Sequence, residues 1–382
     1  MSAAPLLSPA ARALAERLHA ALADRCAQLD GADLAHTAPA VPEFLPEYRA
    51  APVPADLRPG RAELIVEASD LHALRAALTS GADAVVIDFD DTFSPTRANV
   101  AAAYGALPEW LAAPVPLLAR PRALYALESH EPFGGQPGRA ALCDLAALLT
   151  AGAGLTAGAG RAPHLYLPKL ESVAQAQVWA DALALTEAHL GLGRGTLRVC
   201  LQVETFPGLL AADALLFTLR DWAFGLNAGR WDYVFSLVKT VGADLDRPVP
   251  PRAGLGMDLD AMQAYAQALA DVCRARGAQA VGGTAAVAPD PATRGPRGLP
   301  CGPTRPARPR RASRGPGRAC RNCWTPCGRA CAPRRPPRPP CRSRAGDCWT
   351  CPTLARSTGP RCWTRQASRW TCSARGWPDR AS

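Results

Sequence analysis

Two carboxylates lie near separate strand-like runs and could together hold a metal ion. Glu204 closes the run 196–204, and Asp232 opens the run 232–238. Oxygen ligands that leave positions open for water and substrate suit Mg²⁺, which takes few protein ligands. Alternatively, Glu204 caps a helix and Asp232 pairs with Arg230. The spacing alone leaves both interpretations open.

A third candidate is Arg120, which follows the apolar residues 116–119 at the end of an expected strand, with Pro121 fixing the turn. A guanidinium at that place could stabilise a developing oxyanion. The simpler interpretation is a solvated arginine at the rim of the fold, and the residue taken alone favours it.

Three aspartates, Asp88, Asp90 and Asp91, crowd the end of the run 84–89. Neighbouring carboxylates repel one another, so a nearby cation, either a metal ion or Lys169, would relieve the cluster. A solvated loop in which one acid caps the next helix explains it equally well. His130 and His164 have no partners at metal-ligand spacing, and we expect structural roles for both.

Strand-like runs alternate with helical stretches through the region that carries these residues. The expected strands are 62–68, 84–89, 114–121, 164–170, 196–204, 232–238 and 278–283. The expected helices are 8–27, 71–80, 138–150, 172–190, 207–220 and 258–276, and residues 151–160 are expected to form a loop. This rhythm predicts a parallel sheet with crossover helices.

The polar residues gather where the expected strands end. In a (β/α)8 barrel that face carries the active site. A doubly wound sheet also places its site at strand ends, but no glycine-rich phosphate loop follows the first strand here. The sequence therefore favours the α/β class and, within it, a (β/α)8 TIM-type barrel.

The last 82 residues differ in composition from the rest. From Cys301 onward there are 19 Arg, no Lys and two acids, so this part carries +17, and residues 1–300 carry −7 of the chain's +10. The basic total is therefore no sign of nucleic-acid binding by the body. The four cysteines of residues 1–300 fit a reducing compartment. With no membrane-length apolar run and no secretory signal, we expect a cytoplasmic protein without a membrane or nucleic-acid partner.

Seven ordered blocks together resemble malate synthase, the A-type form. They are FLPEYRAAPVPADL (44–57), VVIDFDDTFSPTRAN (85–99), LLARPRAL (117–124), LYLPKLES (165–172), VETFPG (203–208), GLNAGRWDYVFS (225–236) and VGGTAAVAP (281–289). The resemblance implies a (β/α)8 barrel with a C-terminal helical domain over its mouth. It also implies a Claisen condensation of acetyl-CoA with glyoxylate and water, with Mg²⁺ as cofactor, that gives malate and CoA.

The resemblance also implies roles for individual residues. Arg120 matches the arginine that stabilises the enolate, and Glu204 and Asp232 match the two magnesium ligands. Asp88, Asp90 and Asp91, with Lys169, are implied to support the metal site. Three mild departures leave these charges in place: Ala123 replaces a glycine, Ala228 replaces a cysteine, and the acidic block reads DFDDTFSPT.

The Arg-, Pro- and Cys-rich tail cannot lay down a periodic apolar face. Cys320-x2-Cys323 and Cys348-x2-Cys351 have the spacing of zinc ligands. However, Cys-Trp-Thr occurs three times, at Cys323, Cys348 and Cys362, and its codons read two bases later encode Leu-Asp. The same offset applied to residues 300–317 permits a stretch similar to the next malate synthase block. We therefore interpret the tail as out-of-frame translation.

These interpretations divide the chain into three parts: an N-terminal helix and arm (1–60), a barrel (61–293) and a disordered tail (294–382). The resemblance places the last barrel strand, the helical domain and the catalytic aspartate that acts as base outside the matching sequence. We therefore expect the chain as printed to be inactive and prone to aggregation. The alternatives are a related barrel lyase acting on malyl- or citramalyl-type thioesters, and a basic Cys-rich protein that binds zinc or nucleic acid through the tail.

Overall fold

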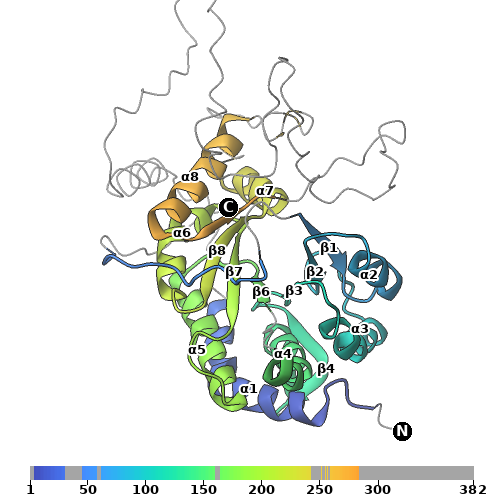
Figure 1. Cartoon of the computed structure of the whole chain (residues 1–382). Helices are drawn as coiled ribbons and strands as arrows, with labels where there is room; N and C mark the ends of the chain where they lie inside the picture. The colour runs from blue at the N-terminus through green and yellow to red at the C-terminus, as the bar shows by residue number, and fades with distance from the viewer. Residues whose placement is uncertain are drawn as a thin grey trace, which may run out of the picture. The chain divides into compact units, whose positions relative to one another are not determined.

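The computed structural model describes residues 4–30, 45–57, 62–159, 164–241, 251, 254, 256 and 259–283. Within them, seven strands form one parallel sheet in the order β1-β2-β3-β6-β7-β8-β9 (Figure 1). The strands are β1 (Glu63–Glu67), β2 (Ala84–Asp88), β3 (Leu117–Arg120), β6 (His164–Leu167), β7 (Arg198–Val203), β8 (Ala223–Ala228) and β9 (Gln279–Val281). In the described part of the chain β1 and β9 are the edges of this curled sheet, as in a barrel that is not closed.

Helices alternate with the strands along the chain. They are α1 (Pro9–Asp30), α2 (Leu71–Leu78), α3 (Arg97–Leu111), α4 (Ala140–Ala159), α5 (Val173–Leu190), α6 (Phe206–Thr218), α7 (Arg230–Val241) and α8 (Asp260–Arg276). Several begin at a side-chain cap: Thr96, Ser172 and Thr205 each accept a hydrogen bond from a backbone N–H in the first turn. The first helix packs against α4 and α5, so it belongs to the helical layer around the sheet.

The two faces of the sheet bury different cores. Side chains on the helix side join one large apolar cluster with the helices. A smaller cluster fills the other, inner face with Val86, Leu118, Tyr166 and Phe224 among its members. Successive residues of a strand point to opposite faces, so Asp88 and Arg120, two residues beyond Val86 and Leu118, lie on that inner face.

Residues 45–57 cross the amino-terminal ends of the strands, opposite the end that carries the polar residues (Figure 1). The backbone N–H of Ala51 donates to the carbonyl of Ala223 at the start of β8, and Asp56 pairs with His164 at the start of β6, at 3.0 Å. Leu57 is 2% exposed and completes the inner core. This segment therefore closes the bottom of the curled sheet.

The structure corrects several expected elements. Residues 232–238 form part of helix α7 rather than a strand, and the strand before it is β8. Residues 151–159, expected as a loop, continue helix α4. The sequence analysis also missed α3 and a hairpin of β4 (Leu127–Phe133) and β5 (Gln136–Arg139). The expected disordered tail lies outside the described residues.

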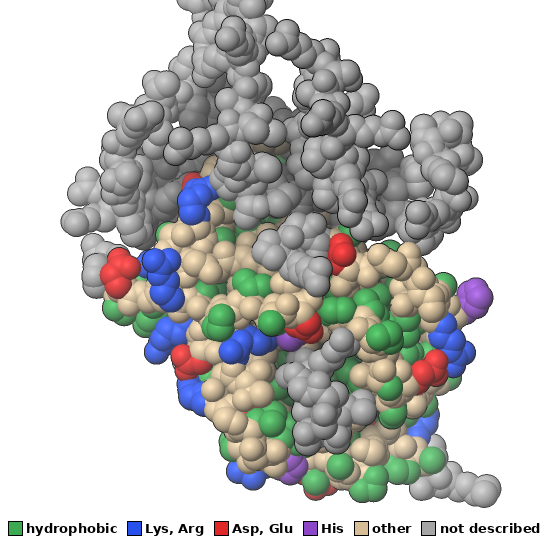
Figure 2. All heavy atoms as spheres, viewed as in Figure 1, with side chains coloured by type: hydrophobic (Ala, Val, Ile, Leu, Met, Phe, Trp, Pro, Cys, Tyr) green, Lys and Arg blue, Asp and Glu red, His purple; other side chains and the backbone are tan. Residues whose placement is uncertain are grey.

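The surface drawn in Figure 2 mixes basic and acidic side chains among apolar and neutral ones, without a large patch of one sign among the described residues. No helix among these residues is both long and apolar enough to span a membrane. The four cysteines of the described part, Cys26, Cys143, Cys200 and Cys273, are buried.

Candidate active site

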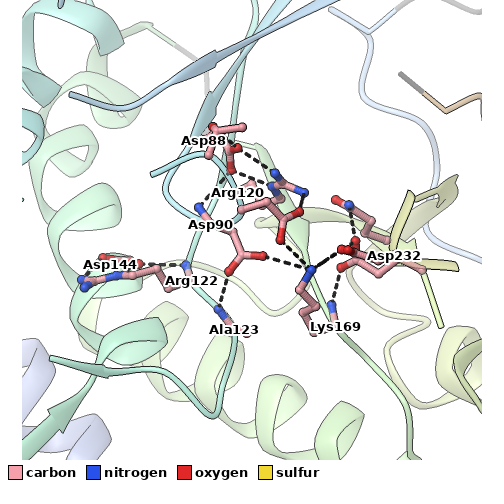
Figure 3. A network of polar contacts seen from close by, with 12 residues as sticks. Asp88, Asp90, Arg120, Arg122, Ala123, Asp144, Lys169 and Asp232 are labelled. Carbon is pink, nitrogen blue, oxygen red and sulfur yellow. Dashed lines mark hydrogen bonds and ion pairs between the residues drawn. The ribbon is translucent and has the colours of Figure 1, made fainter. Parts of the chain in front are cut away.

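The polar residues singled out in the sequence meet at the carboxyl ends of neighbouring strands (Figure 3). Asp88 ends β2 and Arg120 ends β3, which pair directly in register. Lys169 follows β6, Glu204 follows β7, and Asp232 lies in the first turn of α7, just after β8. We call Asp88, Asp90, Asp91, Glu204 and Asp232 the rim carboxylates.

Arg120 and Asp88 form a buried bidentate ion pair. The Nε of Arg120 donates to Asp88 Oδ1 at 2.6 Å, and its Nη2 donates to Oδ2 at 2.7 Å. Arg120 is 5% exposed and Asp88 is fully buried. Burial disfavours the charge on Arg120, but hydrogen bonding and Coulomb attraction from Asp88 outweigh it and raise the pKa of the guanidinium. The solvated-arginine interpretation is therefore wrong.

Lys169 lies among four of the rim carboxylates. Its Nζ is 2.6 Å from Asp91 Oδ1, hydrogen-bonds Asp232, and lies 3.7 Å from Glu204 and 3.8 Å from Asp90. Burial opposes the charge, but the nearby carboxylates prevail, so the pKa of Lys169 is raised. The pKa of Asp232 is lowered because its hydrogen bond and attraction to Lys169 exceed the cost of burial.

The Glu204 carboxylate is held by both oxygens. Oε1 accepts from the backbone N–H of Lys169 at 2.7 Å, and Oε2 accepts from Gln202 Nε2 at 2.6 Å. Gly229 lies directly against it, since an added Cβ there would stand 2.3 Å from Glu204 Cβ. Glu204 is 1% exposed, and this burial raises its pKa to about 8 despite Lys169 and Arg120.

Asp90 is held by the loop after β3. Its Oδ1 accepts from the backbone N–H of Ala123 at 3.1 Å, while its Oδ2 is buried and has no hydrogen-bond partner in the described structure. Burial raises the pKa of Asp90 to about 6. Asp90 Oδ2 lies 3.8 Å from Lys169 Nζ and can still accept a hydrogen bond or bind a cation.

The same loop is fixed from below by a second buried pair. Asp144 on α4 accepts hydrogen bonds from the backbone N–H and the guanidinium of Arg122, at 2.7 to 2.9 Å. Arg122 also donates to Glu128 on β4 at 2.7 Å. Because Arg122 is next to Ala123, this pair positions the N–H that holds Asp90, and it ties the rim to the helical layer (Figure 3).

One oxygen from each of Asp91, Glu204 and Asp232 lies within 4.8 Å of the other two. Only oxygen ligands are offered, which suits a hard cation such as Mg²⁺. The close approach that Gly229 allows, and the Asp90 oxygen that accepts no hydrogen bond in the described structure, also favour a bound cation. The residues present therefore fit a magnesium site, and Asp91, expected only to support it, lies as close as the two expected ligands.

The contacts also contradict the simpler interpretations, in which Glu204 and one acid of the aspartate cluster cap helices and Asp232 pairs with Arg230. The helix after Glu204 is capped by Thr205, and the helix after the aspartate cluster is capped by Thr96. Asp232 pairs with Lys169, whereas the Arg230 guanidinium lies over the Trp231 ring. The sequence analysis missed Gln202 and Gly229. Gln202 could have been found, because it lies two residues before Glu204 on the same face of the strand.

Sequence comparisons show which known proteins the chain is similar to. Residues 116–295 match a family described as "Malate synthase, TIM barrel domain". Malate synthase of Myxococcus xanthus is 34% identical over 273 residues, covering 65% of this chain and 50% of that protein. Malate synthase A of Escherichia coli is 32% identical over 254 residues, covering 62% and 48%. The chain thus spans about half the length of these relatives.

Among solved structures, the chain is similar to a magnesium and glyoxylate complex of Haloferax volcanii malate synthase. The superposition has a TM-score of 0.44 at 15% identity and covers 59% of this chain and 63% of that one.

Proposed function

Since residues 116–295 belong to the malate synthase TIM-barrel family, we propose that the rim carboxylates and Arg120 bind Mg²⁺ and glyoxylate for condensation with acetyl-CoA. Water then cleaves the thioester, so that acetyl-CoA, glyoxylate and water give malate and CoA. The observation that carries this proposal is the convergence of Asp91, Glu204 and Asp232 within 4.8 Å, next to Arg120.

Glu204 and Asp232 are the proposed metal ligands, with Asp91 as a third candidate. Mg²⁺ bound there would polarise the aldehyde of glyoxylate and orient its carboxylate. The two hydrogen bonds to Glu204 and the contact with Gly229 fix its carboxylate before any ligand arrives. Such fixed orientation reduces the reorganisation needed on binding.

Arg120 is the proposed group that stabilises the enolate oxygen. A guanidinium has five N–H donors, and three of them are used on Asp88 and Asp91 in the described structure. Two can therefore serve a ligand oxygen. Asp88 keeps the guanidinium charged and in one orientation, which is the preorganisation that oxyanion stabilisation requires.

Deprotonation of the acetyl methyl group needs a base, and no rim carboxylate is proposed for it. The resemblance implies that this base is an aspartate that lies outside the barrel. Binding of Mg²⁺ and glyoxylate by the barrel and catalytic turnover can therefore be tested separately. We keep the out-of-frame tail, the inactivity that would follow from it and the cytoplasmic location as parts of the proposal. Sequencing the DNA across codons 285–300 tests the frame directly.

The proposal is tested by titrating the purified chain with Mg²⁺ and glyoxylate in a calorimeter. We expect Mg²⁺ binding, glyoxylate binding that depends on Mg²⁺, and loss of both in Glu204→Gln and Asp232→Asn. Glutamine and asparagine keep the shape of the acid and remove its charge. Wild-type affinity in both variants would refute the proposed site.

CoA release from acetyl-CoA and glyoxylate provides the second readout. Because we interpret the tail as out-of-frame, we expect no CoA release, and appreciable release would contradict that interpretation. A related malyl-thioester lyase would instead cleave a malyl thioester without needing free glyoxylate. Stoichiometric zinc in the purified protein would favour the Cys-rich binding alternative.

A further inference from the structure

Lys169 occupies the position among the rim carboxylates where a divalent cation would bind. Its Nζ hydrogen-bonds Asp91 and Asp232 and lies 3.7 Å from Glu204. These three residues are the same three that offer the metal-ligand oxygens. The side chain is 15% exposed, so its ammonium group reaches into the rim and away from bulk water.

The backbone of Lys169 is held in an unusual conformation that supports this placement. Its φ of +55° lies in the left-handed region, which non-glycine residues seldom adopt. In this conformation the backbone N–H of Lys169 donates to Glu204 while its side chain reaches Asp91 and Asp232. Surrounding contacts must offset such strain, and its occurrence at a functional rim is a reason to look for a role.

Charge balance indicates what this role is. Among the residues that the structure describes, the five rim carboxylates face two cationic side chains, Arg120 and Lys169. Arg120 is committed to Asp88 by two hydrogen bonds. In the described structure Arg120 also reaches Asp91, whereas Lys169 is the cation that Asp91 and Asp232 share when no metal is present. Its ammonium and a metal ion would compete for the same oxygen lone pairs and repel each other.

Resting on the proposed function, we propose that Lys169 is an internal substitute for the metal ion, which Mg²⁺ displaces when it binds. Lys169 keeps the ligand carboxylates together in the metal-free protein and lowers the apparent metal affinity by competing for them. It is a positioning residue that sets the metal affinity of the site.

The chain contains two lysines, Lys169 and Lys239, so the chemical reactivity of each can be followed separately. Lys239, on α7, is exposed and serves as an internal control. The full chain is treated briefly with acetic anhydride, with and without Mg²⁺, and acetylation is measured at each lysine by peptide mass spectrometry. We expect Mg²⁺ to increase acetylation of Lys169 severalfold and to leave Lys239 unchanged.

The second measurement is Mg²⁺ affinity by calorimetry in Lys169→Met, with Lys239→Met as the matched control. If the ammonium occupies the site about nine-tenths of the time, its removal raises the apparent affinity about tenfold. Lys239→Met should bind like the wild type. Thermal unfolding followed by circular dichroism verifies that both variants fold, and the acetylation test needs no variant at all.

The possible failures are distinguishable. If Mg²⁺ binds the wild type but leaves Lys169 acetylation unchanged, or if Lys169→Met binds Mg²⁺ no more tightly, the displacement is refuted and the metal site stands. If neither the wild type nor Lys169→Met binds Mg²⁺, the proposed metal site falls and the displacement with it.

Discussion

Gly229→Ala adds a single methyl group beside Glu204 and tests whether the position of that carboxylate matters. The new Cβ would stand 2.3 Å from Glu204 Cβ, 2.9 Å from Glu204 Oε2 and 3.2 Å from Gln202 Cγ. Carbon atoms in contact are normally about 3.5–4.0 Å apart. Glu204 must therefore move by about 1 Å or more, because the short contact is to its Cβ and not to the end of a flexible chain.

A displacement of this size matters because metal-ligand distances tolerate only about 0.2 Å. We expect Mg²⁺ affinity to fall at least about tenfold, which corresponds to about 1.4 kcal/mol. Overpacking should also cost about 1–3 kcal/mol of folding stability, lowering Tm by about 2–4 °C for each kcal/mol. Calorimetric titration and thermal unfolding measure the two effects.

Gly105→Ala is the matched control. Gly105 lies inside α3, and an added Cβ there meets no atom within 4 Å. This variant should leave Mg²⁺ binding unchanged and should stabilise the helix by about 0.5–1 kcal/mol. Wild-type Mg²⁺ affinity in a folded Gly229→Ala protein would show that Glu204 needs no close approach to Gly229, and the steric reasoning would be wrong.

Three further predictions concern other parts of the molecule. Arg120→Met should lower the free energy of unfolding, measured by chemical denaturation, by about 3–5 kcal/mol, because it leaves the buried charge of Asp88 without this ion-pair partner. A decrease below about 1 kcal/mol would contradict the importance of the pair. Leu57→Ala should lower the free energy of unfolding by about 2–5 kcal/mol, because it opens a cavity at the bottom of the sheet. Leu127 is 55% exposed, so Leu127→Ala should change the free energy of unfolding by no more than about 0.5 kcal/mol. Burial raises the pKa of Glu204 from its ordinary 4.5 to about 8. Between these pH values the metal-free folded state holds an extra proton, so its stability should fall as pH rises through them. Near neutral pH, Mg²⁺ binding should therefore release about one proton, and a Mg²⁺ affinity that does not change with pH would refute this.

Most of the sheet could be predicted because its strands are continuous apolar runs that end in polar residues. Six of the seven strands overlap the expected ranges. The error at 232–238 has a physical cause, since aromatic and β-branched residues favour strands only when packing agrees. Tyr233 and Val234 are buried, and Leu237 and Val238, four residues further on, also face the core, so the helical period prevails.

The sequence analysis missed β8, the strand that precedes α7, because of its composition. Gly225 and Asn227 have low strand propensity. However, an added Cβ at Gly225 would stand 2.6 Å from the carbonyl oxygen of Gln279 on β9. A glycine is required there by the close approach of a strand some 50 residues away in the sequence, which no local pattern reveals. Pro108 near the end of α3 obscured that helix in the same way.

At the site, the identity of the charged residues could be predicted, and their pairing could not. The charges of Asp88, Arg120, Glu204 and Asp232 are explicit in the sequence, and parallel strands bring their ends together. Which cation meets which acid depends on register and on the left-handed backbone of Lys169. Neither property is encoded locally, so the sequence could offer Lys169 as a cation for the aspartate cluster, but its contacts with Glu204 and Asp232 emerged only from the structure.

Anomalous diffraction from crystals of the full chain soaked in Mn²⁺ tests the central claim most directly. We predict one strong peak at coordination distance from Glu204 and Asp232, with the Arg120 guanidinium beside it. A well-diffracting, Mn²⁺-saturated crystal with no peak at these carboxylates, or with its main peak elsewhere in the barrel, would contradict the proposed site.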